Sequence, residues 1–135
     1  MADLSITAAN VVKGAGSTTR SGTCGTAAIT AGDALYTLSG ALELADTATA
    51  VTAACVGIAL CDAAAGQPVV YLAAGLIDPG AIVAIGTYYA LSATAGNIAP
   101  IADCAAGDFV TGLGFGTAAD EITVAINASN VQVPA

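Results

Sequence analysis

The side chains that usually carry out chemistry are few in this chain, and histidine is missing altogether. Without an imidazole, neither serine nor cysteine has its usual general base, and the commonest metal ligand is absent. The adjacent acids Asp120 and Glu121 stand at the expected entrance of a strand, where we expect both to be solvated. Most aspartates stand in or beside turn-forming residues, where Asp accepts local backbone hydrogen bonds: Asp33, Asp46, Asp62, Asp78, Asp108 and Asp120. We therefore expect no catalytic site, no cofactor and no enzymatic activity.

The four cysteines do not have the spacing of a metal site. Cys24, Cys55, Cys61 and Cys104 include no Cys-x-x-Cys pair, which argues against zinc in a chain without histidine. An even number of cysteines permits two disulfides. The N-terminus, however, has no basic stretch before an apolar block, so it does not resemble a signal peptide. We expect synthesis in a reducing cytoplasm and free, partly buried thiols.

Two glycine-rich stretches have the composition of phosphate-binding loops but not their spacing. In "GLGFG" (residues 112–116) the GxGxxG spacing is absent, and the stretch lies in an expected strand. In "KGAGSTT" (residues 13–19) the lysine precedes the glycines instead of following them. Both stretches are therefore expected to be structural.

Positive charge is confined to the start of the chain. The formal net charge is −8, and the two basic residues are Lys13 and Arg20. So few cations cannot neutralise a run of phosphates, so we expect no nucleic-acid partner. Lys13 and Arg20 flank a polar, glycine-rich stretch and are the candidate contacts to a protein partner. Residues 1–28 are either an extended arm that reaches this partner or a first strand followed by a mobile loop.

Alternating apolar and polar residues predict strands rather than helices. The pattern is clear for Leu4 and Ile6, for Leu42 and Leu44, and over residues 122–127. Turn-forming residues separate such stretches at 31–33, 39–40, 65–67, 78–80, 96–97 and 106–108. The longest uncharged run, residues 79–102, is interrupted by glycines and prolines, so we expect no transmembrane helix. The sequence predicts an all-β fold, a small antiparallel β-barrel or sandwich.

The chain contains two similar halves. "YTLS" (residues 36–39) matches "YALS" (residues 89–92), and residues 56–74 match residues 111–128, with Gly57 aligned to Gly112 at expected bulges or close approaches. The alanine-rich residues 41–56 resemble a helix, but their counterpart contains Pro100, so neither is expected to be helical. We predict one β-domain over residues 29–135, built from pseudo-repeats at about 29–74 and 77–128. Since alanine buries little area, we expect association to supply part of the stability.

Five stretches of the chain together resemble a known family. They are residues 1–19, "AGDALY" (31–36), "VGIALCDAAAGQPVVYLAAG" (56–75), "GTYYALSATAGNIAPIAD" (86–103) and "GDFVTGLGFGTAADEITVAINAS" (107–129). Together they are similar to the small capsid decoration, or cement, proteins of tailed bacteriophages. The resemblance implies a β-domain that is made in the host cytoplasm, oligomerises on the outer surface of the head and ties major capsid subunits together. It implies no catalytic residues, and it leaves a homodimer and a homotrimer equally open.

Two other classes of binding protein remain as alternatives. A fibre-base or receptor-binding module would need a larger aromatic or polar face than Tyr36, Tyr71, Tyr88 and Tyr89 provide. A flat ice-binding surface would need a repeated array, and the sequence offers a single Thr-x-Thr at residues 47–49. Under the resemblance to capsid decoration proteins, Lys13 and Arg20 are the tentative capsid contacts.

Overall fold

The computed structural model describes residues 3–4, 6–81 and 83–134, and within these residues the fold is all-β, as predicted. Two short 3-10 helices, η1 (Ala8–Asn10) and η2 (Ile101–Asp103), accompany the strands. The strands are β1 (Val11–Lys13), β2 (Thr18–Thr23), β3 (Ala34–Leu38), β4 (Ala41–Leu44), β5 (Cys55–Ala59), β6 (Pro68–Pro79), β7 (Tyr88–Leu91), β8 (Ile98–Pro100), β9 (Phe109–Ala118) and β10 (Glu121–Gln132).

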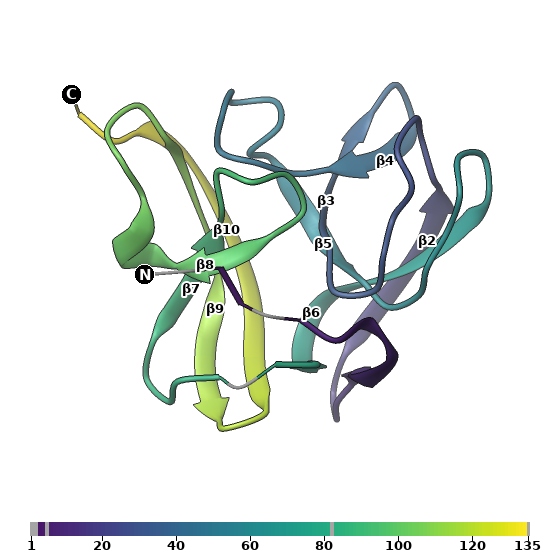
Figure 1. Cartoon of the computed structure of the whole chain (residues 1–135), viewed down its shortest axis with the longest axis horizontal. Coiled ribbons are helices and arrows are strands. Elements are labelled where there is room, and N and C mark those ends of the chain that lie inside the picture. The colour runs from purple at the N-terminus through teal and green to yellow at the C-terminus, as the bar shows by residue number, and fades with distance from the viewer. Residues whose placement is uncertain (1–2, 5, 82, 135) are drawn as a thin grey trace.

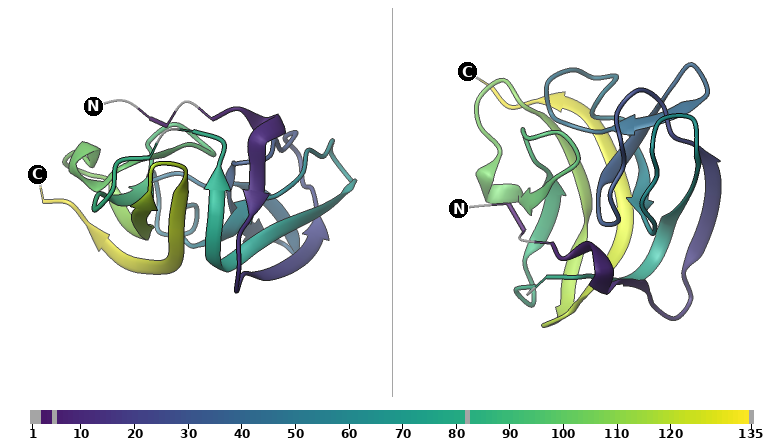
Figure 2. Two further views of the ribbon diagram at one scale, coloured as in Figure 1. Left: turned by 90° about the horizontal axis from the view of Figure 1, so that it is seen from below. Right: turned by 45° about the vertical axis from the view of Figure 1, so that its right-hand side comes forward.

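The strands form one antiparallel sheet whose order reads the same way from both ends. The order is β4-β3-β5-β6-β10-β9-β7-β8, so β3 to β6 and β7 to β10 have equivalent places on either side of the β6–β10 junction. Figure 1 shows these groups as two lobes side by side. We call β3 to β6 the first lobe and β7 to β10 the second lobe. The antiparallel sheet is curled into a half-barrel, as Figure 2 shows.

Equivalent backbone hydrogen bonds recur in the two lobes. In both, a residue on the third strand accepts from the N–H of a glycine before the first strand and donates to the carbonyl of the residue that follows this glycine. The distances are Gly32 N to Ala59 O 2.8 Å, Ala59 N to Asp33 O 2.8 Å, Gly86 N to Gly116 O 2.8 Å and Gly116 N to Thr87 O 2.9 Å. The two lobes thus repeat the same strand arrangement, but these bonds equate Ala59 with Gly116, two residues beyond the Gly114 that the sequence match pairs with Ala59. The repeat limits at residues 29–74 and 77–128 stay predictions.

The predicted alternation and turns position the core. In β10, Ile122 and Val124 are buried while Thr123 and Ala125 are exposed. In the first hairpin, Ser39 and Gly40 have positive φ angles of 53° and 83° and join β3 to β4 as a two-residue turn. Residues 45–54 form turns and loops instead of a helix, as predicted. One hydrophobic cluster spans both lobes, and a smaller one lies in the first lobe around Leu35.

The N-terminal segment is extended but is fastened to the domain along β6. Strand β6 pairs with β5 and then β10 along one edge, and with β2 and then β1 along the other. Of the two alternatives for residues 1–28, a mobile loop after the first strand is wrong for Thr18–Thr23, because these residues form β2. A strand as long as β6, with 12 residues, has a long row of backbone N–H and C=O groups along each edge. The threonine-rich strand β2 pairs with part of this row, so these groups are not left without hydrogen bonds.

The strand expected at Leu4 and Ile6 is also wrong. Residues 3–4 and 6–7 have no regular secondary structure. The apolar side chains still pack against the core cluster that spans the lobes. Gly32, with a φ of 95°, leaves the space that the Ile6 side chain fills, since a Cβ there would lie 2.6 Å from Ile6 Cγ2. The apolar residues of this alternation are therefore half-buried against the core without belonging to a strand.

Candidate interaction surface

Hydrogen bonds from the first residues anchor the N-terminal segment to the second lobe. Ser92 Oγ donates to Asp3 Oδ1 at 2.6 Å, and Asn97 Nδ2 donates to Asp3 Oδ2 at 2.8 Å. Leu4 N donates to Ile98 O at 2.8 Å. Further along, Thr7 N donates to Gly80 O at 2.8 Å, at the junction between the lobes. The segment thus crosses both lobes before it enters β1.

The two cations lie on the outer edge of the first lobe. Lys13 ends β1 opposite Ile77, and Arg20 lies in β2 opposite Tyr71. Both side chains are exposed, and no carboxylate of the described residues lies within ion-pair distance of either. The sequence contains no acid between Asp3 and Asp33. We call residues 11–23 the cationic edge, because this segment carries the chain's positive charge and no negative side chain.

An apolar hollow lies beside the cationic edge. It has a volume of about 350 Å³ and is lined by Val11, Val12, Lys13, Thr19, Leu60 and Val70. Val12 is 56% exposed and Val70 is 42% exposed. Exposed valines beside an unpaired lysine are typical of a protein-binding surface. The valines provide apolar area that a partner can bury, and the charge of the lysine orients that partner.

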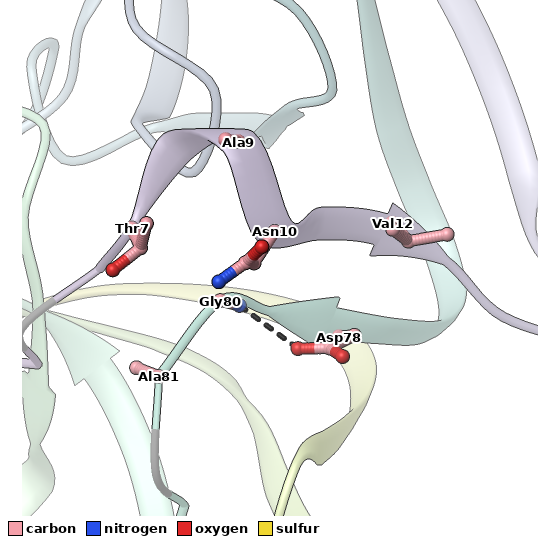
Figure 3. Close-up of a pocket in the computed structure, with 7 residues that line it drawn as sticks. All are labelled: Thr7, Ala9, Asn10, Val12, Asp78, Gly80 and Ala81. Carbon is pink, nitrogen blue, oxygen red and sulfur yellow. Dashed lines mark hydrogen bonds between the residues drawn. The ribbon is translucent and has the colours of Figure 1, made fainter.

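A second, shallow hollow lies where η1 and β1 meet the end of β6 (Figure 3). Its volume is about 620 Å³, and its lining residues are Thr7, Ala9, Asn10, Val12, Asp78, Gly80 and Ala81. Its carboxylate is engaged locally, because Gly80 N donates to Asp78 Oδ1 at 2.9 Å. The Thr7 hydroxyl and the Asp78 carboxylate, the lining groups that could act as nucleophile and base, are not hydrogen-bonded to each other. We therefore regard this hollow as part of the surface beside Val12 and not as a reaction site.

The aspartates perform the structural role that the sequence predicts. Four of the six predicted turn aspartates accept a local backbone N–H at 2.9–3.0 Å, namely Asp33, Asp46, Asp78 and Asp108. For Asp62 the local bond is wrong, because this aspartate accepts Ala31 N at 2.8 Å, from a distant part of the chain. Burial raises the pKa of Asp33, the hydrogen bond from Thr30 N opposes this shift, and the nearby charge of Asp62 adds to it. Asp120 lies in the β9–β10 turn and Glu121 begins β10, as predicted.

All four cysteines are free thiols in the structure. Cys24 and Cys55 are buried, and Cys61 and Cys104 are half-buried. Burial raises the pKa of Cys55 to about 11. Burial, and then the charges of Asp108 and Asp103, also raise the pKa of Cys104. These thiols are therefore mostly protonated near neutral pH, and neither Cys55 nor Cys104 is activated as a nucleophile.

The glycine-rich stretches lie where the sequence analysis expects them. "GLGFG" belongs to β9, and Gly112 leaves room for the Tyr88 ring. In the other stretch, Gly14 packs against Leu76, since a Cβ there would lie 2.6 Å from Leu76 Cβ. Gly57 approaches Tyr71 and Leu72 closely. The glycines thus permit close packing. Gly57 and Gly112 are both close approaches, as predicted, but the position equivalent to Gly57 in the second lobe is Gly114, where a Cβ would meet the backbone oxygen of Thr123.

An exposed aromatic patch on the second lobe was missed by sequence reasoning. Tyr88 and Phe115 lie with ring centroids 4.6 Å apart at 49°, and Phe115 is 53% exposed. Ile85, which is 71% exposed, lies just before the Gly86 turn that hydrogen-bonds to β9. The other tyrosines, Tyr36, Tyr71 and Tyr89, are buried. The sequence gives no signal for this exposure, because glycines stand on both sides of Phe115 and leave no alternation to show which face of β9 it occupies.

In the part of the chain that the structure describes, no three His, Cys, Asp or Glu side chains lie together in a way that could hold a metal ion. Residues 3–4, 6–81 and 83–134 also contain no helix long and apolar enough to cross a membrane. No family model, curated protein or solved structure matches the chain. The similarity to phage decoration proteins therefore rests on the five sequence stretches alone.

Proposed function

We propose that this chain is a structural virion protein, a capsid decoration or cement protein of a tailed bacteriophage. It binds the outer surface of the head as a homodimer or homotrimer and stabilises the lattice of the major capsid protein. The observation that carries the proposal is the cationic edge. In a chain of net charge −8, both cations and the two exposed valines Val12 and Val70 lie on the margin of one lobe.

Stabilisation by such a protein follows from mass action. A protein that binds the assembled shell and not the free subunits lowers the free energy of the shell by its binding free energy at every occupied site. The fold suits this role because residues 3–13 fix β1 against both lobes, so little ordering entropy is lost when the edge binds. The cations orient the encounter, and the exposed valines contribute buried apolar area.

The test is to mix the purified chain with undecorated heads and, separately, with free capsid subunits, and to measure binding by co-sedimentation. We expect binding to heads alone, and light scattering should report a dimer or a trimer. The variant Lys13→Ala/Arg20→Ala should bind modestly more weakly and with less dependence on salt, because exposed ion pairs contribute about 0–1 kcal/mol each. A monomer that does not sediment with heads would refute the proposal.

The alternative is a fibre-base or receptor-binding module, and the patch of Ile85, Tyr88 and Phe115 is the observation that favours it. Exposed aromatic rings are typical of surfaces that bind sugars or other proteins. Binding of the purified chain to host cells, lost in Phe115→Ala and retained in Lys13→Ala/Arg20→Ala, would support this alternative over capsid decoration.

A further inference from the structure

Strand β2 has a ladder partner along one side only. In the described residues it pairs with β6, over Thr18–Thr23 and Pro68–Ala74. On the other side, β4 reaches only the C-terminal end of β2, through the Cys24–Leu42 bridge and the bond from Gly25 N to Leu42 O at 2.8 Å, and leaves the edge at Thr19 and Ser21 open. Five of the six residues of β2 are exposed, and Gly22 is half-buried. In both views of Figure 2, β2 lies at the outer margin of the first lobe. An unpaired edge of this kind is a template for another strand.

The hydrogen-bond pattern identifies which backbone groups of β2 face outward. Along an antiparallel strand, the backbone groups of successive residues point to alternate edges. Val70 uses its groups on the side of β5, because Leu60 N donates to Val70 O at 2.8 Å and Val70 N donates to Cys61 Sγ at 3.4 Å. The next residue of β6, Tyr71, therefore faces β2.

Since Tyr71 is paired with Arg20, the backbone groups of Arg20 face β6. Cys24, an even number of residues after Arg20, also directs its backbone toward β6, because Cys24 N donates to Gln67 O at 2.8 Å. The N–H and C=O groups of Thr19 and Ser21 accordingly point away from the sheet. They are available to hydrogen-bond with an added strand.

Charge decides which kind of strand fits this edge. Arg20 lies in the middle of β2, and no acid occurs between Asp3 and Asp33. If β2 paired antiparallel with β2 of a second copy about a two-fold axis, the two Arg20 side chains would lie close together, and like charges at such positions are unfavourable. A segment that carries carboxylates would instead gain from both Arg20 and Lys13.

We infer that the outer edge of β2 binds an extended, carboxylate-bearing segment of a capsid subunit by strand addition. The inference rests on the proposed function, because it takes the capsid as the partner. Backbone groups of Thr19 and Ser21 supply the hydrogen bonds, and Arg20 selects for a carboxylate. The hollow that Thr19 shares with Leu60 and Val70 accommodates an apolar side chain of the added strand.

The experiment compares Ser21→Pro with its matched control Ser21→Ala in binding to undecorated heads. Proline removes the outward N–H and leaves the pairing with β6 intact, because edge strands tolerate proline where the N–H faces away from the sheet. Alanine removes the hydroxyl and keeps that N–H. We expect roughly tenfold weaker binding for Ser21→Pro, because a capsid carbonyl is left unpaired, and unchanged binding for Ser21→Ala. Arg20→Glu should weaken binding more than Arg20→Gln.

Hydrogen exchange of the wild-type chain covers the case in which Ser21→Pro fails to fold. The peptide that contains residues 18–23 should exchange more slowly on heads than in solution, and unchanged exchange would overturn the inference. Equal binding of Ser21→Pro and Ser21→Ala would overturn strand addition and leave the proposed function standing. A smaller oligomer for Ser21→Pro would assign the edge to a second copy and overturn the capsid as its partner. If the wild-type chain does not bind heads, both proposals fail.

Discussion

At the scale of single residues, the carboxylates and thiols of this chain serve the fold. Aspartates that a search for chemistry singles out close turns by accepting backbone N–H groups. The buried thiols of Cys24 and Cys55 behave as small apolar side chains. Histidine-free sequences of this kind are therefore best interpreted by asking which backbone donors each acid satisfies.

Burial and acidity together predict the order in which the thiols react. The thiolate is the reactive form, so the half-buried Cys61 should be modified first by a disulfide reagent at pH 8. Cys104 should follow more slowly, because its pKa is raised. Cys55, with a pKa of about 11, and the buried Cys24 should react only in denaturant. Mass spectrometry of labelled peptides measures this order, and rapid labelling of Cys55 in the native chain would contradict it.

The same free thiols predict that a reductant leaves the melting temperature unchanged. A native disulfide would instead lower the free energy of unfolding on reduction by about 2–5 kcal/mol. A melting curve with and without reductant is the control for the labelling experiment.

The raised pKa of Asp33 predicts that Asp33→Asn stabilises the chain at neutral pH. The folded chain binds the Asp33 proton more tightly than the unfolded chain, so its stability falls as pH rises from the ordinary carboxyl pKa through the raised one. Asparagine retains an oxygen that can accept the bond from Thr30 N. The variant should therefore be at least as stable as the wild type at pH 7, and this advantage should vanish in acid.

Asp108→Asn is the matched control for this prediction. Asp108 Oδ2 accepts Ala105 N at 2.9 Å in the same i to i−3 arrangement, in a turn of the second lobe. We expect no gain of stability from this control at pH 7. If thermal melts show Asp33→Asn to be the less stable protein at pH 7, the charge of Asp33 is favourable in the fold and the prediction is wrong.

At the scale of elements, the third strand of the first lobe depends on a glycine. A Cβ on Gly57 would meet the Tyr71 ring and the backbone oxygen of Leu72 in β6. Backbone cannot move aside as a flexible side chain does, so Gly57→Ala should lower the free energy of unfolding by about 1–3 kcal/mol. In the control Gly22→Ala, the new Cβ would lie 2.9 Å from the tip of the buried Leu42 side chain, which can adjust at a smaller cost than backbone. Denaturant unfolding would contradict the prediction if both variants lose the same amount.

The elements that could be predicted from the sequence are those with a local signal. The turn at Ser39 and Gly40, the alternation of β10 and the repeated glycines Gly57 and Gly112 each have a pattern within a few residues. Strand β2 could not be predicted in this way. It is polar and exposed, and its pairing depends on the long-range position of β6. The same applies to the candidate surface. Lys13 and Arg20 could be recognised in the sequence by their charge, but the position of β2 at the edge of the sheet could not be predicted.

At the scale of the whole molecule, the N-terminal segment ties the lobes together. Asp3 accepts hydrogen bonds from Ser92 and Asn97 of the second lobe, and β1 and β2 pair with β6 of the first lobe. Deletion of residues 2–20 removes both sets of contacts. We therefore expect this deletion to unfold or severely destabilise the chain, and not simply to weaken its attachment to heads.

Asp3→Ala tests the tie with a single change. It removes the acceptor for the hydroxyl of Ser92, which is 7% exposed and would keep only the bond that it accepts from Thr94 N, and it also removes the acceptor for Asn97 Nδ2. The free energy of unfolding should therefore fall by about 1–3 kcal/mol. Asp120→Ala, in an exposed turn, should cost far less. Circular dichroism in denaturant compares the two variants, and equal stability would show that the tie at Asp3 is unimportant.

The palindromic strand order also bears on how such a chain can originate. The antiparallel contact of β6 with β10 is the contact that two identical half-chains would make around a two-fold axis. A gene that encoded one lobe would therefore specify a symmetric dimer with its seam at this strand. Tandem duplication and fusion of that gene would turn the seam between subunits into a covalently linked ladder. Each half could then diverge, and a single N-terminal extension would suffice to cover the remaining edge of β6.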